Sequence, residues 1–427
     1  MTSIPAAGNG KGTGKMEGEN QAQRDCSAND GQIINLVNDI LTKAVQEGAS
    51  HIHIEPLSEK IQIRLRKDGV LAKPVELPAE TRDGLVTRLK ILAGLNITER
   101  RVPQSGRLNM EVRTGKTVDF RVHSIPYLAG EGAAVRILNK DSSSRALNDL
   151  GMGERESAIF KNNLSRAHGL LLCSGLADSG KTTTLYSALA SLNPETQKIV
   201  TVEDPVEVPL LGIQQMAFRH EVGLTFAAAM RTFLQPDVDA DVIMISDLRD
   251  AETVSLAAKA VTRGKLVLAG MYADDCVLAV TRLLNLGLEP SLLTSTVNTI
   301  LSQRLVRRLC PICKEPAAHD PEDLHRSGFT TEQVAQRRQL FIARGCPQCS
   351  GLGYSGRIGI FELMEMRSNV ARAIRSRASE EDLRAAAFKD RMASLRQAGI
   401  SKALDGMTSL EEVLRCTFDY RVQDNDH

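Results

Sequence analysis

The sequence predicts an α/β protein with a mainly parallel central sheet, preceded by a smaller α+β domain and followed by a helical, cysteine-bearing region. Three observations support this. Strand-like apolar runs alternate with helix-like runs through the middle of the 427-residue chain. A glycine-rich loop stands between the first such strand and helix, and two Cys-x-x-Cys pairs come later. Alternating strands and helices are typical of parallel sheets covered by helices on both faces.

The composition is that of an ordinary globular protein of two to three domains. Lys and Arg number 53 and Asp and Glu 52, which leaves a net charge of +1, and only 4% of residues are aromatic, with no Trp. The chain therefore has no strong positive electrostatic field and few aromatic side chains on which bases could stack. We expect no nucleic-acid partner. No apolar run approaches a membrane span, and the polar N-terminus is unlike a signal peptide, so a cytoplasmic protein is expected.

The first part of the chain predicts a disordered segment, a small domain and a linker. Residues 1–32 are rich in Gly, Asn and charge, which predicts disorder. Residues 33–140 form the α+β domain, with a largely antiparallel sheet. Its expected helices are 33–47 and 85–95, and its expected strands are 50–55, 60–66, 107–112, 117–124 and 132–138. Residues 141–152 are polar and turn-rich, as in a linker.

The α/β domain covers residues 153–309. Its expected strands are 169–174, 198–203, 241–246 and 266–271, and its expected helices are 181–192, 225–234, 250–262 and 275–287. A ligand of such a sheet binds at the carboxyl ends of the strands. Beyond it we expect a cysteine insertion over 310–350 and a helical region over 351–427.

The loop after the first strand fits the pattern G-x-x-x-x-G-K-[ST]. Glycines let backbone N–H groups turn toward phosphates, and the following helix adds the positive end of its dipole. Lys181 can reach the β- and γ-phosphates, and the Thr182 hydroxyl can ligate Mg²⁺. The expected nucleotide-binding residues are Gly175, Ser179, Gly180, Lys181, Thr182 and Thr183.

Two later strands end in carboxylates, at Glu203 and Asp247. In a protein with a phosphate loop, such a strand delivers its carboxylate to Mg²⁺ or to the attacking water. We therefore expect Lys181, Glu203 and Asp247 to be catalytic, and Thr182 and Asp247 to hold Mg²⁺. Either carboxylate alone is a weak signal, but the two support each other in this order.

The four cysteines Cys310, Cys313, Cys346 and Cys349 form two C-x-x-C pairs. Two such pairs can complete a tetrahedral S₄ zinc site with no open position, so the site is expected to be structural. Cys173 and Cys276 have no ligand spacing and fit a core.

These motifs, in this order, resemble the secretion ATPases of type II secretion and type IV pilus assembly (the GspE/PilB family). The resemblance rests on residues 179–186, 202–207, 223–228, 241–244 and 303–313, and on the N-terminal stretches 47–55, 100–107 and 130–131. Residues 356–363 and 408–414 also match. It implies a RecA-like ATPase domain that binds ATP and Mg²⁺ against the swinging N-terminal domain. It further implies a homo-hexameric ring at the inner-membrane face, bound to a membrane platform protein, which drives pilus or pseudopilus assembly. Many members carry a further N-terminal recruitment domain, for which we expect no room here.

Several chemical positions depart from the family pattern. Asp178 replaces a loop glycine, Asp247 replaces a glutamate, and Lys265 and Tyr272 replace two histidines. Gly132 stands where an arginine is common, so Arg121 and Arg136 remain the candidate γ-phosphate contacts. Aspartate withdraws the carboxylate by one methylene, and misplacing a catalytic group by about 1 Å can cost around a hundredfold in rate.

Two main hypotheses and one more distant alternative stay open. The chain is either a working, retuned motor or a nucleotide-binding, hydrolysis-poor paralogue that serves as a structural or regulatory ring subunit. A DNA-translocating RecA-like motor is more distant and would rest on the basic cluster Arg304, Arg307 and Arg308. Such a cluster is more often a solvated helix face or a subunit contact.

Overall fold

The computed structural model describes residues 31–112, 115, 117–138 and 145–418, and these form two compact units, Met1–Asn139 and Lys140–His427. Nearly all of the segment expected to be disordered, and residues 141–144 of the expected linker, lie outside the described residues. Residues 31–32 already belong to a helix, and part of the remaining linker forms the 3₁₀ turn η2 (Leu147–Leu150).

The N-terminal unit is a seven-stranded antiparallel sheet covered by helices. Its strands run in the order β3-β2-β1-β7-β6-β5, with β4 beside β2. They are β1 (His51–Pro56), β2 (Lys60–Lys67), β3 (Val70–Leu71), β4 (Val75–Pro78), β5 (Gln104–Glu111), β6 (Thr117–Tyr127) and β7 (Gly130–Leu138). A helix over 31–46 and α2 (Thr81–Leu92) pack on the sheet, because Leu41 and Leu89 join Ile52 and Val135 in one core. The expected antiparallel sheet is confirmed.

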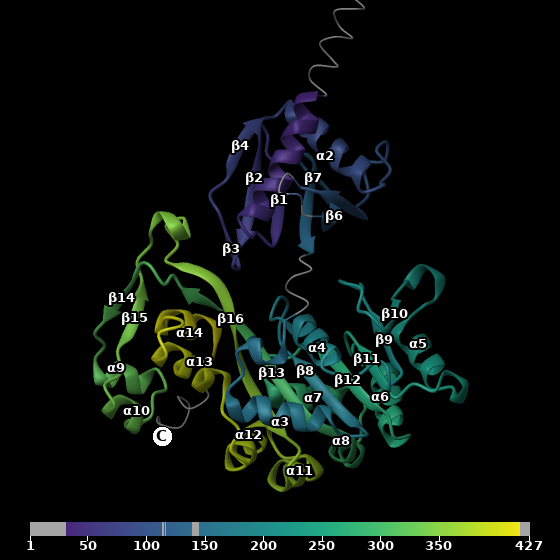
Figure 1. Ribbon diagram of the computed structural model, residues 1–427, viewed down its shortest axis with the longest axis vertical. Helices are drawn as coiled ribbons and strands as arrows, with labels where there is room; N and C mark the ends of the chain where they lie inside the picture. The colour runs from purple at the N-terminus through teal and green to yellow at the C-terminus, as the bar shows by residue number, and fades with distance from the viewer. Residues whose placement is uncertain (1–30, 113–114, 116, 139–144, 419–427) are drawn as a thin grey trace, which may run out of the picture. The chain divides into compact units, whose positions relative to one another are not determined.

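The second unit is built on a seven-stranded sheet of order β10-β9-β11-β12-β8-β13-β16. The pairings from β10 to β13 are parallel, and β16 is antiparallel to β13. The strands are β8 (Gly169–Ser174), β9 (Ile199–Glu203), β10 (Gln214–Ala217), β11 (Val242–Ile245), β12 (Leu266–Met271), β13 (Val297–Leu309) and β16 (Tyr354–Glu365). The four strands predicted from apolar runs are thus neighbours in one sheet (Figure 1).

Helices cover both faces of this sheet, because alternate residues of a strand point to opposite faces. Leu171 and Cys173 of β8 pack toward α3 and α4, whereas Leu170 and Leu172 belong to the core formed with α5 to α8. The helices are α3 (Glu154–Leu164), α4 (Lys181–Ala190), α5 (Phe226–Phe233), α6 (Ala251–Thr262), α7 (Cys276–Asn285) and α8 (Pro290–Thr296).

The region beyond residue 310 is less helical than expected. It contains the hairpin of β14 (Lys314–Ala317) and β15 (Leu340–Ala343) with the short helices α9 (Pro321–Arg326) and α10 (Thr331–Ala335). The twelve-residue strand β16 then enters the main sheet, so the expectation that 351–427 is simply helical is wrong for 354–365. The apolar run of β16 is hydrogen-bonded to β13 far away in sequence, which overrides local propensity. Four helices follow, namely α11 (Ser368–Arg375), α12 (Glu380–Lys389), α13 (Leu395–Leu404) and α14 (Leu410–Cys416).

No helix among the described residues combines the length and apolar character that crossing a membrane requires.

Candidate nucleotide site and metal centre

The glycine-rich loop joins the carboxyl end of β8 to the N-terminus of α4, as the sequence predicts. Gly175 has φ +153°, and a Cβ there would lie 2.5 Å from the Ser179 Oγ and 2.6 Å from the Gln303 carbonyl oxygen. Gly180 has φ +92°. Asp178 has φ +56°, a backbone conformation that favours glycine. Asp178 is exposed, and its negative charge opposes the lowering of the Lys181 pKa.

Gln303 of β13 fixes the loop to the sheet, a role that sequence reasoning missed. Its amide nitrogen donates to the Ser179 carbonyl over 2.8 Å, and its amide oxygen accepts from the Thr184 hydroxyl over 2.8 Å. One step along β13, the Ser302 hydroxyl is hydrogen-bonded to Ser174 at the end of β8. The loop is thus held from the neighbouring strand, whose register no local pattern reveals.

Lys181, the first residue of α4, lies over the loop. Its ammonium donates to the carbonyl oxygens of Gly175 and Leu176, each over 2.9 Å. It also lies 4.0 Å from the ring centroid of Tyr272. Burial lowers the pKa of Lys181, and the nearby carboxylate of Asp247 opposes this shift. The charges of Lys181 and Asp247 therefore act on each other.

Asp247 follows β11 and is 4% exposed. Burial raises its pKa, and a 2.7 Å hydrogen bond from the Arg249 Nε to its Oδ2 opposes the rise. Its Oδ1 is buried and accepts no hydrogen bond from the described residues. Arg249 also contacts Asp204 over 3.1 Å, and so bridges the ends of β9 and β11. A buried carboxylate oxygen without a donor is suited to a cation or a water.

Glu203, at the end of β9, is buried within a network of donors. The Thr201 hydroxyl and the Gln215 amide donate to Oε1 over 2.6 and 2.9 Å, and the Tyr186 hydroxyl donates to Oε2. Burial and the neighbouring carboxylate raise the pKa of Tyr186 well above its usual range. Glu203 therefore ties β9 to α4, whereas we expected its carboxylate to meet Mg²⁺ or the attacking water.

The remaining candidate residues are distributed over both units. Ser179 is buried and its hydroxyl has no hydrogen-bond partner among the described residues, while Thr182 and Thr183 are half-buried in the first turn of α4. Arg121 and Arg136 belong to the N-terminal unit, where they are paired across β6 and β7.

The basic cluster that favoured a DNA-translocating motor lies on strand β13, so the helix face considered for it is wrong. Arg304 pairs with Asp274 over 3.6 Å, and Arg307 pairs with Glu412 over 2.6 Å while its guanidinium lies 4.0 Å from the Tyr354 ring. These contacts explain two of the three arginines as links to neighbouring elements.

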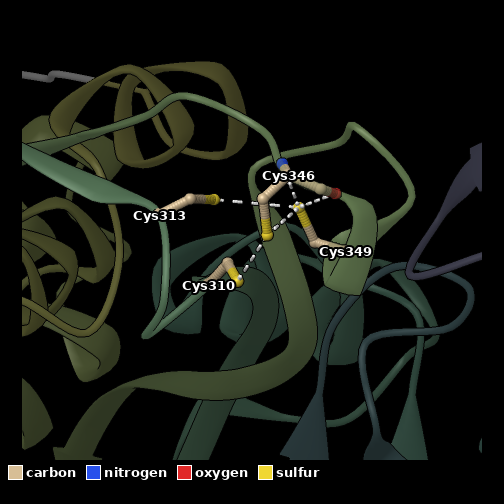
Figure 2. A group of neighbouring side chains, drawn as sticks. All are labelled: Cys310, Cys313, Cys346 and Cys349. Carbon is tan, nitrogen blue, oxygen red and sulfur yellow. Dashed lines mark hydrogen bonds between the residues drawn. The ribbon is translucent and has the colours of Figure 1, made fainter.

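The four paired cysteines converge in space (Figure 2), with all four Sγ atoms within 4.8 Å of one another. The distances are 3.9 Å from Cys310 to Cys346, 3.8 Å from Cys313 to Cys349 and 3.8 Å from Cys346 to Cys349. A tetrahedron of sulfurs about 2.3 Å from a zinc ion has edges of about 3.8 Å, so the thiols fit that metal.

The backbone around these thiols suits thiolate ligands. The N–H groups of Cys346 and Gly353 donate to the Cys349 Sγ over 3.2 and 3.1 Å. Although burial opposes it, these bonds lower the pKa of the Cys349 thiol to about 6. Cys310 directly follows β13 and Cys349 lies just before β16, so the cluster closes the end of this strand pair. Cys173 and Cys276 are buried, as the sequence predicts.

These features define an α/β protein with a glycine-rich turn between a strand and a helix at the carboxyl edge of a parallel sheet. The family described as "Type II/IV secretion system protein" matches residues 26–415, and the chain belongs to that family.

Its curated relatives are named for two related systems. The chain is 41% identical to the "Type IV pilus assembly ATPase PilB" of Myxococcus xanthus, over 94% of this chain and 70% of the relative. It is 41% identical to the "Type II secretion system protein E" of Pseudomonas aeruginosa, over 91% of this chain and 76% of the relative. It is 40% identical to the "Type II secretion system ATPase E" of Vibrio cholerae, over 92% and 76%.

Two solved structures share the fold at lower identity. The Legionella pneumophila ATPase DotB superposes with a TM-score of 0.63 at 16% identity, covering 88% of this chain and 93% of that one. The pilus retraction motor PilT with bound ADP gives 0.58 at 22%, covering 90% and 98%.

Proposed function

We propose that this chain is the motor ATPase of a type II secretion or type IV pilus assembly system, in which ATP binding and hydrolysis drive pseudopilus or pilus assembly. The family membership supports this function, because relatives that match over nearly the whole chain bear these names. The observation that carries it is local: Lys181 and Thr182 begin the helix that follows the loop, and the buried, donor-free oxygen of Asp247 belongs to the same site.

Each residue of the site has its own role in this proposal. Backbone N–H groups of the loop and of the first turn of α4 bind the phosphates, and the positively charged ammonium of Lys181 contacts them. The Thr182 hydroxyl and the Asp247 carboxylate are the groups that would hold Mg²⁺, which neutralises phosphate charge when bound. Arg249 orients Asp247, and Glu203 positions β9 against α4 through Tyr186. Arg121 and Arg136 are proposed γ-phosphate contacts from the N-terminal unit.

We also propose that the chain binds a structural zinc ion and assembles into a ring. The four-cysteine cluster is assigned to structural zinc, because its sulfur spacing fits that ion and leaves no open ligand position. The family supports a homo-hexameric ring that meets a platform protein at the inner membrane, with the chain itself on the cytoplasmic side.

A hydrolysis-poor ring subunit is the second candidate, and the Asp247–Arg249 bond favours it. One oxygen of the carboxylate already accepts a hydrogen bond, and the aspartate is one methylene shorter than the family's glutamate. A nucleotide would bind at such a site without rapid turnover, since the carboxylate stands back from the attacking water.

Steady-state phosphate release by the purified, zinc-loaded protein separates the two candidates. For the motor we expect turnover that Lys181→Ala abolishes and that Asp247→Glu leaves intact or raises. Release no higher than that of Lys181→Ala, in both the wild type and Asp247→Glu, would contradict the motor and leave the hydrolysis-poor subunit.

A further inference from the structure

The sheet places the ring of Tyr272 beside the phosphate loop. Strands β12 and β8 are parallel neighbours, with Met271 opposite Ser174. The N–H of Gly175, the first loop residue, donates to the Met271 carbonyl over 3.2 Å. Tyr272, the next residue after Met271, is therefore fixed next to the start of the loop by strand pairing.

The Lys181 ammonium contacts three groups of the chain itself. Two of its three N–H bonds have acceptors in the Gly175 and Leu176 carbonyls, and the Tyr272 ring lies 4.0 Å away. An aromatic face attracts a cation through its quadrupole. The lysine that is expected to meet phosphate thus contacts two carbonyl oxygens and an aromatic face of its own chain.

We propose that Tyr272 is a positioning residue that holds Lys181 in this loop-bound rest position, so that the ammonium must leave the ring before it contacts the terminal phosphates of a nucleoside triphosphate. This inference rests on the proposed function, because it concerns the same site. It gives a role to one of the two positions where the sequence replaces a family histidine. An imidazole could serve there as a hydrogen-bond acceptor or as a second cation, whereas the phenol ring attracts the lysine through its face.

The exposure of Tyr272 sets the size of the effect and makes it testable. The side chain is 43% exposed, whereas Met271 is fully buried and Ala273 is nearly so. Its contribution to the core is therefore small, and substitutions should leave the fold intact. A half-exposed cation–π contact corresponds to about a two- to fivefold change in an equilibrium constant.

The first test is the dissociation constant for MgATP of the full chain with Tyr272→Phe, Tyr272→Leu and Tyr272→Ala. Phe retains an aromatic face, whereas Leu retains bulk without one. We expect Phe to match the wild type, and Leu and Ala to bind MgATP about two- to fivefold more tightly. AMP, which lacks the phosphates that Lys181 reaches, should bind all four proteins equally. A Phe variant that behaves like Ala, or an Ala variant that binds MgATP more weakly, would overturn the inference.

A second test needs no nucleotide. Acylation of Lys181 by acetic anhydride at fixed pH, followed by mass spectrometry, reports how often the amine leaves its partners, with the exposed Lys259 as the internal reference. Tyr272→Leu and Tyr272→Ala should raise the rate of Lys181 acylation about two- to fivefold relative to Tyr272→Phe and the wild type.

The two tests separate the inference from the proposed function. Faster acylation without any MgATP binding would reject nucleotide binding but retain the rest position. MgATP binding that Lys181→Ala abolishes, with neither reading altered in the Leu and Ala variants, would reject the rest position alone.

Discussion

Gln303 connects the loop, α4 and β13, and its removal should weaken both the fold and the site. The side chain is 2% exposed, and its two hydrogen bonds reach the Ser179 carbonyl and the buried Thr184 hydroxyl. Gln303→Ala leaves both partners buried and unpaired, each at a cost of about 1–3 kcal/mol. Partial relaxation reduces the sum, so we expect the free energy of unfolding of the second unit to fall by about 2–4 kcal/mol. Because the Ser179 peptide shapes the loop, MgATP should bind about tenfold more weakly, a loss of about 1.4 kcal/mol.

Urea unfolding followed by circular dichroism, together with MgATP titration, measures the two effects. Asn298→Ala is the matched control, since Asn298 is also an amide side chain on β13 and donates to the His168 carbonyl over 3.2 Å at the other end of the strand. It should reduce stability by about 1 kcal/mol and leave MgATP affinity unchanged. If Gln303→Ala alters neither quantity more than Asn298→Ala does, then Gln303 does not hold the loop against β13.

Three further predictions concern the metal and two buried carboxylates. Reduced protein should contain about one zinc per chain, and Cys349→Ser should lose it and increase amide exchange at the ends of β13 and β16; metal-free wild type would contradict the assignment. Arg415 and Arg307 hold the pKa of the buried Glu412 at about 2, against burial. Because this folded-state value is below the ordinary one, the stabilisation is complete above about pH 4.5 and is lost toward pH 2. Between about pH 4.5 and pH 2, the free energy of unfolding of Glu412→Gln should therefore fall by about 2–3 kcal/mol less than that of the wild type. Burial raises the pKa of Glu362 to about 7, so stability should fall as the pH rises from about 4.5 through 7. Glu362→Gln should reduce the dependence of the free energy of unfolding on pH between pH 5 and 8. An unchanged dependence would mean that other groups cause it.

Much of the second unit's sheet could be predicted because its signals are local. The apolar runs that became β8 and β12 lie between turn residues, and the glycine-rich loop occupies the expected strand-to-helix turn. The cysteine pairs converge as predicted. Each pair already places two thiols on one turn, so the fold has only to bring the two turns together.

The features that the sequence did not predict depend on strand register and long-range contacts. β16 joins the sheet only through β13, so its apolar run did not indicate which element it would pair with. Gln303 resembles any polar residue in a strand until β13 lies beside the loop. Glu203 was expected to meet Mg²⁺ or water because it ends a strand, but Tyr186 and Gln215 reach it from other elements and donate to its carboxylate. Side-chain partners of this kind follow from the tertiary structure, and no spacing rule contains them.

Equilibrium binding of MgATP to the zinc-loaded chain shows directly whether the glycine-rich loop is a nucleotide site. We predict saturable binding at one site per chain that requires Mg²⁺ and that Lys181→Ala weakens at least tenfold. Thr182→Ala should reduce the dependence on Mg²⁺ more than the affinity for metal-free ATP. Binding that is equal in the wild type and Lys181→Ala, or absent from both, would contradict the assignment of this loop as the nucleotide site.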